Sequence, residues 1–223
     1  MAKTILVIAA HSDDEALGCG GTMARHAALG DTVHVLFLTD GVGARGDAPP
    51  QARARVAAAK NAMEILGAAS MTQLDFPDNR IDTVALLDIV QAIEAKAIPL
   101  APDIIYTHHG GDLNVDHRMC HQAVLTAFRP MPGQSVRAIY GFEVASATEW
   151  GFGSVSDFVP QRFVDISTTL AKKMAALDAY SDEMRDFPHP RSQEALHALA
   201  TWRGATVGCA AAEAFSVIRD VID

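Results

Sequence analysis

Two short segments of the chain concentrate side chains of the types that bind metal ions. Residues 11–15 read His-Ser-Asp-Asp-Glu, and residues 108–117 read His-His-Gly-Gly-Asp-Leu-Asn-Val-Asp-His. Imidazole and carboxylate groups together suit Zn²⁺, and a catalytic zinc site keeps three protein ligands and an open position for water. If the two segments meet in space, they could form a metal site that activates water for hydrolysis.

Each segment taken alone also has a structural interpretation. An Asp-Asp-Glu run before a helix can complement the helix dipole, with Asp13 or Asp14 as the N-cap, and for this segment alone both interpretations are equally good. The histidine pair at the start of the second segment could belong to a loop, and His117 with His121 could form an exposed helical pair. Together, however, these acidic and imidazole groups, with no cationic partner expected nearby, would repel or desolvate one another unless a cation bound. The combination favours a metal.

Hydrophobic patterning predicts alternating strands and helices around these segments. Apolar runs rich in β-branched residues predict strands, and apolar residues three or four positions apart predict helices. The predicted strands are residues 4–10, 32–39, 71–75, 103–107 and 137–142. Helices are predicted at residues 16–29, 82–96, 168–180 and 192–203, and a further alanine-rich helix is predicted to end at Leu66-Gly67. Loops are predicted at residues 40–50 and 146–156.

This alternation predicts an α/β fold in which residues 1–223 form a single Rossmann-like domain. Strands that alternate with helices form a mostly parallel sheet with right-handed crossovers and helices on both faces. Ligands of such sheets bind outside the carboxyl ends of the strands. Because each ligand-rich segment directly follows a predicted strand, we expect both to open into the same crevice.

Composition narrows the class of protein further. A chain of 223 residues suits one core, and no window approaches the ~18 uninterrupted apolar residues of a membrane-spanning helix. The formal charge of −9 disfavours nucleic acid as a partner, because phosphates bind basic surfaces. The N-terminus lacks a signal-peptide pattern, and the odd, scattered cysteines Cys19, Cys120 and Cys209 argue against disulfides. We expect a cytoplasmic protein with buried thiols, and its oligomeric state, including a homo-oligomer, stays open.

The first segment resembles a known signature. Ala10-His11-Ser12-Asp13-Asp14-Glu15 is similar to the AHPDDE motif of the PIG-L/LmbE-like zinc deacetylases, and the second segment resembles their HPDH-type motif. The resemblance runs over most of the chain. It includes the Thr39-Asp40-Gly41 turn, RVAAAKNAMEILG at residues 55–67, Phe76-Pro77-Asp78-Asn79 and Arg191-Ser192-Gln193-Glu194-Ala195.

The resemblance implies a metal site and a base. It assigns His11, Asp14 and His117 as zinc ligands and Asp13 as the catalytic base that takes a proton from the attacking water. The same ligand set of two histidines and one carboxylate could also hold Fe²⁺ or another divalent metal.

The resemblance implies supporting and substrate-binding residues as well. Glu15 would support the first loop from behind the ligands, and Arg55 and Asp78 would contact the substrate, Asp78 through sugar hydroxyls. Asp116 would orient a neighbouring imidazole or the loop of His117, as carboxylates behind metal ligands do.

The chain departs from the family pattern at three positions. Ser12 stands where the family usually has proline, and Ala58 stands where a glutamate is common. Asn114 replaces the first histidine of the HPDH motif, a residue credited with stabilising the oxyanion or protonating the leaving group. Asn114 can donate a hydrogen bond but cannot supply a proton, so His109 could take over the acid or electrostatic part of this role.

We therefore expect a small-molecule N-acetylated sugar, free or linked to a nucleotide or lipid, as the substrate. A non-sugar N-acyl compound or a thiol conjugate is an alternative, and a non-catalytic sugar- or nucleotide-binding module is the weaker third option because no GxGxxG follows the first strand. Arg191 and Arg203 could bind a phosphate or carboxylate, although arginines on helix surfaces are common. Trp150 and Phe152 could stack on a sugar ring or anchor their loop.

Overall fold

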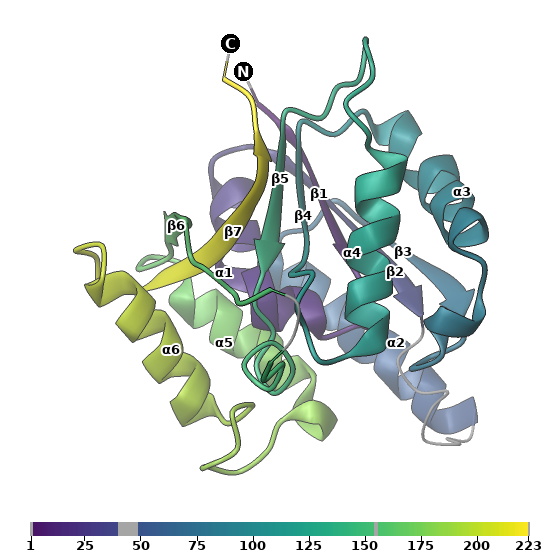
Figure 1. Ribbon diagram of the computed structural model, residues 1–223. Helices are drawn as coiled ribbons and strands as arrows, with labels where there is room; N and C mark the ends of the chain where they lie inside the picture. Colours follow the sequence, from purple (N-terminus) through teal and green to yellow (C-terminus); the bar gives the residue numbers. More distant parts are fainter. Residues whose placement is uncertain (1, 40–48, 154–155, 223) are drawn as a thin grey trace.

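The computed structural model describes residues 2–39, 49–153 and 156–222, which form one sheet between two layers of helices (Figure 1). The strands are β1 (Thr4–Ala9), β2 (Thr32–Thr39), β3 (Ser70–Phe76), β4 (Ile104–His108), β5 (Ala138–Phe142), β6 (Arg162–Asp165) and β7 (Ala212–Asp220). The α-helices are α1 (Asp14–Ala28), α2 (Pro49–Leu66), α3 (Leu86–Ala97), α4 (Val115–Ala127), α5 (Leu170–Ala179) and α6 (Gln193–Ala205). Short 3₁₀ helices span η2 (Ile81–Thr83), η3 (Ile98–Leu100) and η4 (Ser181–Glu183).

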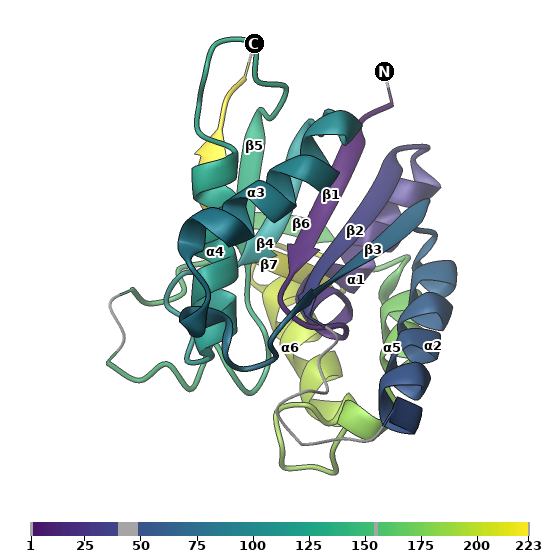
Figure 2. The ribbon, with the colours of Figure 1, turned by 90° about the vertical axis from the view of Figure 1, so that its right-hand side faces the viewer.

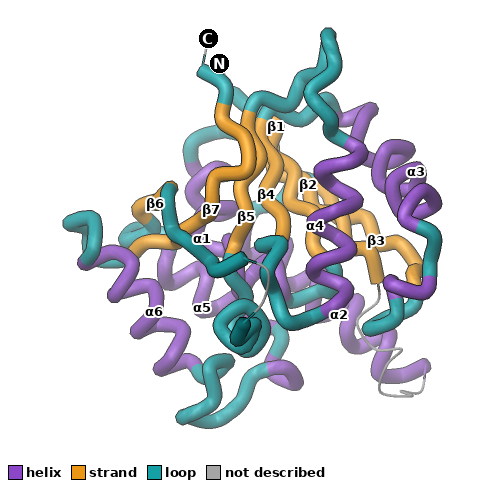
Figure 3. The backbone as a smooth tube through the Cα atoms, viewed as in Figure 1, coloured by secondary structure: helices purple, strands orange, loops and turns teal. Residues whose placement is uncertain are grey.

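The sheet is mixed but mostly parallel, with the strand order β3-β2-β1-β4-β5-β7-β6 (Figure 3). Strands β1 to β5 run parallel to one another, and β7 runs antiparallel to both β5 and β6. The predicted α/β class and the mostly parallel sheet are confirmed. The carboxyl ends of the parallel strands lie at the edge of the sheet opposite to the N-terminus (Figure 1).

Helices cover both faces of the sheet, as predicted. Helices α3 and α4 lie on one face, and α1, α2 and α5 lie on the other (Figure 2). Strand β1 is buried because it supplies side chains to both cores: Ile5, Val7 and Ala9 to one, and Leu6 and Ile8 to the other. A strand covered on both faces needs apolar residues at every position, which explains the unbroken apolar run in the sequence.

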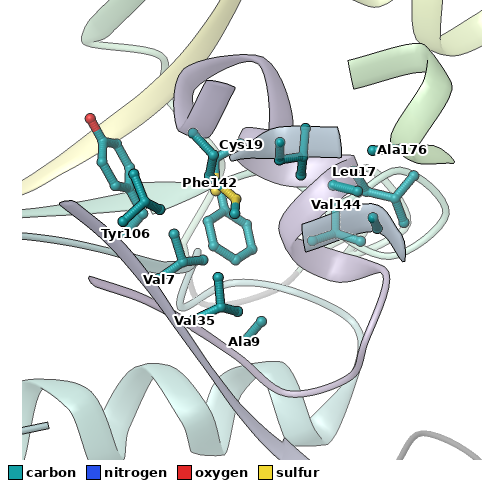
Figure 4. Packing of buried hydrophobic residues seen from close by; sticks show 14 of the residues in the cluster. Val7, Ala9, Leu17, Cys19, Val35, Tyr106, Phe142, Val144 and Ala176 are labelled. Carbon is teal, nitrogen blue, oxygen red and sulfur yellow. The ribbon is translucent and has the colours of Figure 1, made fainter. Parts of the chain in front are cut away.

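The core beside α1 is packed closely enough to require a glycine. The ring of Phe142 lies against Cys19 and the neighbouring aliphatic side chains (Figure 4). A Cβ atom on Gly18 would overlap this ring. A larger residue at position 18 would therefore push α1, and the metal-type ligands at its start, away from the sheet.

Helix α1 is broken by a kink at Cys19, where φ is −146°. The broken helix leaves backbone groups without helical partners, and a buried ion pair satisfies them. Nζ of Lys173 donates to the carbonyl of Leu17 at 2.7 Å, and Glu213 accepts the N–H of Gly21 at 2.9 Å. The two side chains also contact each other at 2.6 Å. The first turn of α1, which carries the acidic residues of the first segment, is thus held separately from the rest of the helix.

The structure corrects several predicted boundaries and adds elements that we did not predict. Strands β6 and β7 and helix α4 at residues 115–127 were not predicted. The helix predicted at 82–96 begins later, because Val84 and Ala85 are extended between η2 and α3. Helix α2 begins at Pro49, inside the predicted loop 40–50. Residues 40–48 of that loop and residues 154–155 of the predicted loop 146–156 lie outside the described part of the chain.

Candidate metal centre

The two ligand-rich segments meet at the carboxyl edge of the sheet. Strands β1 and β4 are neighbours, so the loops that follow them open on the same side. The N–H of Ala10, just before the first segment, donates to Nε2 of His108 at 2.8 Å, and the same nitrogen lies 3.4 Å from Oδ2 of Asp14, so the two segments are in direct contact. The predicted convergence of the two segments is therefore what the structure shows.

His11, Asp14 and His117 lie together and are buried. Nε2 of His117 lies 3.3 Å from Nδ1 of His11 and 3.3 Å from Oδ2 of Asp14, and Nδ1 of His11 lies 3.2 Å from the same oxygen. Ligand atoms at about 2.1 Å from a tetrahedral zinc ion lie roughly 3.4 Å apart. The three side chains therefore fit a divalent metal ion without rearrangement.

Asp14 carries a second observation in favour of a cation. Its Oδ1 atom is buried and has no hydrogen-bond partner among the described residues. Buried carboxylate oxygens are normally paired, so an unpaired one indicates a bound group. Burial alone would raise the pKa of Asp14, but the nearby His117 and His108 and the hydrogen bond to His11 outweigh burial and hold the pKa well below its usual value.

The imidazole rings show the same preference for positive charge. Burial would lower the pKa of His117, but Asp14 and Asp112 beside it raise the pKa to about 9. His117 Nε2 and His11 Nδ1 face each other, so one cation between them would take the place of a proton. The group of His11, Asp14 and His117 thus favours a positive charge between the two rings, which suits a metal site.

Each histidine of the group is held from behind by a carboxylate. Oδ2 of Asp116 lies 3.0 Å from Nε2 of His11, while Oδ1 accepts the N–H of Ile81. Oδ2 of Asp112 lies 3.1 Å from Nδ1 of His117. Such carboxylates fix the orientation of a metal-binding ring. Asp112 belongs to the second segment but was missed by the sequence analysis, which considered only Asp116 for this role.

A second set of possible ligand atoms consists of Nε2 of His11 with carboxylate oxygens of Asp78 and Asp116. Asp78 Oδ1 lies 3.1 Å from Nε2 of His11. The Oδ2 atom of Asp116 already accepts the N–H of Asn79 at 2.6 Å. Because Nε2 can donate its proton to these carboxylates, hydrogen bonds explain the second set without another metal.

Asp13 lies at the N-cap position of α1 with a φ of 139°, a conformation that is strained for a residue other than glycine. Asp13 thus takes the N-cap position that the structural interpretation gave it, but its side chain makes no capping hydrogen bond. Oδ2 of Asp13 contacts Nη1 of Arg191 at 2.8 Å and Nη2 of Arg55 at 3.3 Å. Burial raises the pKa of Asp13, although both arginines oppose this shift. The expectation that no cationic group accompanies the acidic cluster is therefore wrong for Asp13.

Arg55 lies under the first loop, in contact with protein groups. Its Nε donates to Oγ of Ser12 at 3.0 Å, and its Nη1 contacts Oε1 of Glu183 at 2.6 Å. Glu15 lies nearby and accepts the hydroxyl proton of Tyr180 at 2.7 Å and the N–H of Asp13 at 3.0 Å. Burial raises the pKa of Glu15 to about 8. Sequence reasoning missed Glu183 and Tyr180, which carry no motif.

Asn114 and His109, the two residues predicted to assist the oxyanion or the leaving group, contact different parts of the protein. Oδ1 of Asn114 caps helix α4 by accepting the N–H of Asp116, and its Nδ2 donates to Asn79. The ring of His109 contacts the carbonyl of Ser156 at 3.0 Å and meets Phe158 edge to face. These contacts direct His109 toward the loop after β5.

The structure also shows the surroundings of the other histidine, arginine, tryptophan and cysteine candidates from the sequence. His117 is buried, so the exposed pair with His121 is excluded. Arg203 pairs with Glu143 through two contacts of 2.9 and 2.7 Å, and Trp150 meets the ring of His189 edge to face.

Cys19 and Cys120 are buried and Cys209 is partly buried, all as free thiols. Among the described residues, no helix has the length and apolar character needed to cross a membrane.

A mostly parallel sheet with a buried His-Asp-His group at its carboxyl edge defines an α/β protein with a candidate divalent-metal site. Residues 6–128 match the PIG-L family, described as GlcNAc-PI de-N-acetylase, and the chain belongs to this family. The family resemblance seen in the sequence is confirmed.

Two curated relatives extend the likeness beyond these residues. The uncharacterized deacetylase YaiS of Escherichia coli K12 is 34% identical over 182 residues, covering 78% of this chain and 89% of YaiS. The diacetylchitobiose deacetylase of Thermococcus kodakarensis is 29% identical over 231 residues, covering 98% of this chain and 84% of that protein. Relatives of this chain are thus deacetylases.

Solved structures share the fold over the whole chain. The conserved protein TT1542 of Thermus thermophilus superposes with a TM-score of 0.77 at 27% identity, covering 100% of this chain and 97% of that one. GalB of Pseudomonas putida KT2440, a 4-carboxy-2-hydroxymuconate hydratase, gives a TM-score of 0.72 at 26% identity, covering 99% and 98%. The same fold therefore occurs in proteins with different activities.

Proposed function

We propose that this protein is a zinc-dependent N-deacetylase that hydrolyses the acetamide group of an N-acetylated amino sugar or its conjugate. The observation that carries the proposal is the buried group of His11, Asp14 and His117, with Asp13, the chain neighbour of Asp14, also buried. Membership of the PIG-L family and the deacetylase relatives support the reaction class. The name of the Thermococcus kodakarensis relative supports a substrate of the N-acetylglucosamine type.

His11, Asp14 and His117 would hold the ion. A zinc ion in such a site lowers the pKa of water to about 7 and polarises a carbonyl group. Asp13 would take the proton of the attacking water as the new C–O bond forms at the acetamide carbon. The C–N bond then breaks, Asp13 returns the proton to the amine, and acetate leaves.

Asp116 and Asp112 would keep the two imidazoles in their metal-binding orientation. Asp78, whose carboxylate lies beside His11, would bond a sugar hydroxyl, and Arg55 would contact the substrate. Asn114 keeps one amide N–H for the developing oxyanion, since its other polar groups bond to the start of α4 and to Asn79. His109 is the second candidate donor to the oxyanion.

The test is an assay of the zinc-loaded protein with a panel of N-acetylated compounds. The panel contains N-acetylglucosamine, diacetylchitobiose, a nucleotide-linked N-acetylglucosamine and an N-acetyl amino acid, and both free amine and acetate are measured. We expect equal amounts of amine and acetate from the sugar compounds. Asp13→Asn should keep its zinc and lose activity by about 10²–10⁴-fold. Absence of amine from every compound would reject the proposal.

A hydratase is the second candidate, because the likeness to GalB covers nearly the whole of both chains. Adding water to a carbon-carbon double bond also needs an activated water and a base, so the same site could serve it. The two functions are separated by the product. A hydratase consumes 4-carboxy-2-hydroxymuconate and releases no acetate from the panel, whereas a deacetylase does the reverse. A non-catalytic binding module would do neither and would not need one zinc ion per chain.

A further inference from the structure

The cation nearest to Asp13 comes from the far end of the chain. Arg191, 178 residues away in sequence, donates from Nη1 to Oδ2 of Asp13 at 2.8 Å. No hydrogen bond to Oδ1 of Asp13 is found within residues 2–39, 49–153 and 156–222. We propose that Arg191 is a positioning residue that holds Oδ2 of Asp13 and thereby presents Oδ1 to the water that attacks the substrate. This inference rests on the proposed function, in which Asp13 is the base.

The guanidinium of Arg191 is itself held in place by neighbouring loops. Its Nε donates to Oγ of Ser146 at 2.8 Å and to the carbonyl of Ala145 at 3.3 Å. Its backbone N–H donates to Nδ1 of His189 at 3.1 Å, and the next residue, Ser192, is the N-cap of α6. Arg191 therefore reaches Asp13 from a rigid support, not from a freely rotating side chain.

Asp13 has particular need of such support. Its φ of 139° places it outside the usual conformations, and its carboxylate does not cap α1, so the helix does not fix the side chain. A base must stay within hydrogen-bonding distance of the proton that it removes. A displacement of about 1 Å can lower a rate by about 10²-fold. The contact with Arg191 supplies the missing constraint.

Arg55 does not duplicate this role. It lies 3.3 Å from Oδ2 of Asp13, and its guanidinium is already engaged by Ser12 and Glu183. Glu183 also lies 3.8 Å from Nη1 of Arg191, so the cluster holds two arginines and two carboxylates. The balanced charge lowers the cost of burying these groups. A lysine at position 191 could not reproduce both the Nε and the Nη contacts, because it lacks the planar fork of arginine.

The kinetic test compares Arg191→Gln, Arg191→Lys and Arg191→Ala with the wild-type protein on the substrate that the panel identifies. Arg185→Gln is the matched control, because among the described residues the guanidinium of Arg185 bonds only to the backbone carbonyls of residues 182 and 184. We expect kcat to fall about 10²-fold in Arg191→Gln with KM and zinc content nearly unchanged. Arg191→Lys should recover part of the loss. Added guanidinium ion should raise kcat of Arg191→Ala, whereas urea at the same concentration should not.

A second test does not depend on activity. The melting temperatures of Asp13→Asn, Arg191→Gln and the double variant form a cycle, in which we expect the double variant to lose less than the sum of the single losses. If the wild-type protein hydrolyses nothing, the proposed function fails while the cycle still reports the contact. Additive losses in the cycle would overturn the inference. Wild-type kcat in Arg191→Gln, or a loss confined to KM, would overturn it as well.

Discussion

Oδ2 of Asp112 lies 3.1 Å from Nδ1 of His117, while Nε2 of the same ring points to Asp14 at 3.3 Å. The ring thus lies between the Asp112 carboxylate and the candidate metal position. Oδ2 of Asp112 also accepts the hydroxyl proton of Thr148 at 2.7 Å, so the support is itself anchored to the loop after β5.

Replacing Asp112 should therefore weaken metal binding without removing a ligand. We expect Asp112→Asn to lower zinc affinity by about 10–100-fold, because an amide neither fixes the ring as firmly nor raises its basicity. Competition with a zinc-binding dye measures the affinity. Asp88→Asn, on the exposed side of α3, is the control and should bind zinc like the wild-type protein. Equal affinities in all three proteins would contradict the role of Asp112.

Removal of the metal should destabilise the fold. The ion would neutralise the buried Asp14 carboxylate, and a ligand that binds only the folded state at 100 times its Kd adds about 2.7 kcal/mol to the free energy of unfolding. Chelation should lower the melting temperature, and one equivalent of Zn²⁺ should restore it. His117→Ala should lose this response, whereas His121→Ala, outside the ligand group, should keep it. A wild-type melting curve that is unchanged by chelator and zinc would count against the site.

The buried pair of Lys173 and Glu213 should be important for stability. Each side chain satisfies backbone groups exposed by the kink in α1, and each neutralises the other. Glu213→Ala should lower the free energy of unfolding by about 3–5 kcal/mol, because it leaves a buried ammonium group without its partner. Urea denaturation measures the loss. Lys172→Met, one position away on the exposed face of α5, should change stability little. A comparable loss in both variants would show that the pair has no special role.

His26 should make stability depend on pH. Burial lowers the pKa of His26 below 6.5, although its contact with Asp31 opposes the shift. As the pH falls below about 6.5, the unfolded chain therefore binds this proton more readily than the folded chain does, and the free energy of unfolding decreases. His26→Gln should remove this component. The melting temperature of the variant should therefore fall less than that of the wild-type protein between pH 7.5 and 5.5, about one pH unit either side of the ordinary histidine pKa of 6.5. His197→Gln, on the exposed face of α6, should follow the wild-type curve.

The arrangement of the first five strands was predictable because it is encoded locally. The apolar run of residues 4–10 and the helical spacing of residues 16–29 depend only on neighbours in the chain, and alternation of such runs restricts the topology to a few parallel sheets. Since the ends of neighbouring parallel strands share an edge, the meeting of residues 11–15 with residues 108–117 also followed from the sequence.

The missing elements lack a local signal. Strand β7 is buried at its first four residues and mixed afterwards, so its sequence does not alternate in the manner of an antiparallel strand. Helix α4 buries Asp116 and His117 where a helix would ordinarily place apolar residues. Hydrophobic periodicity predicts a buried helix or strand only where the buried residues are apolar.

The sequence by itself determined the fold class, the family and the residue types gathered at the sheet edge, because each of these depends on short-range patterns. Tertiary structure alone decided which groups support them: Arg191 on Asp13, Asp112 on His117, and Lys173 with Glu213 in the kink of α1. These contacts join side chains whose spacing along the chain carries no periodicity. They arise only when packing removes the charged groups from water and each must find a partner.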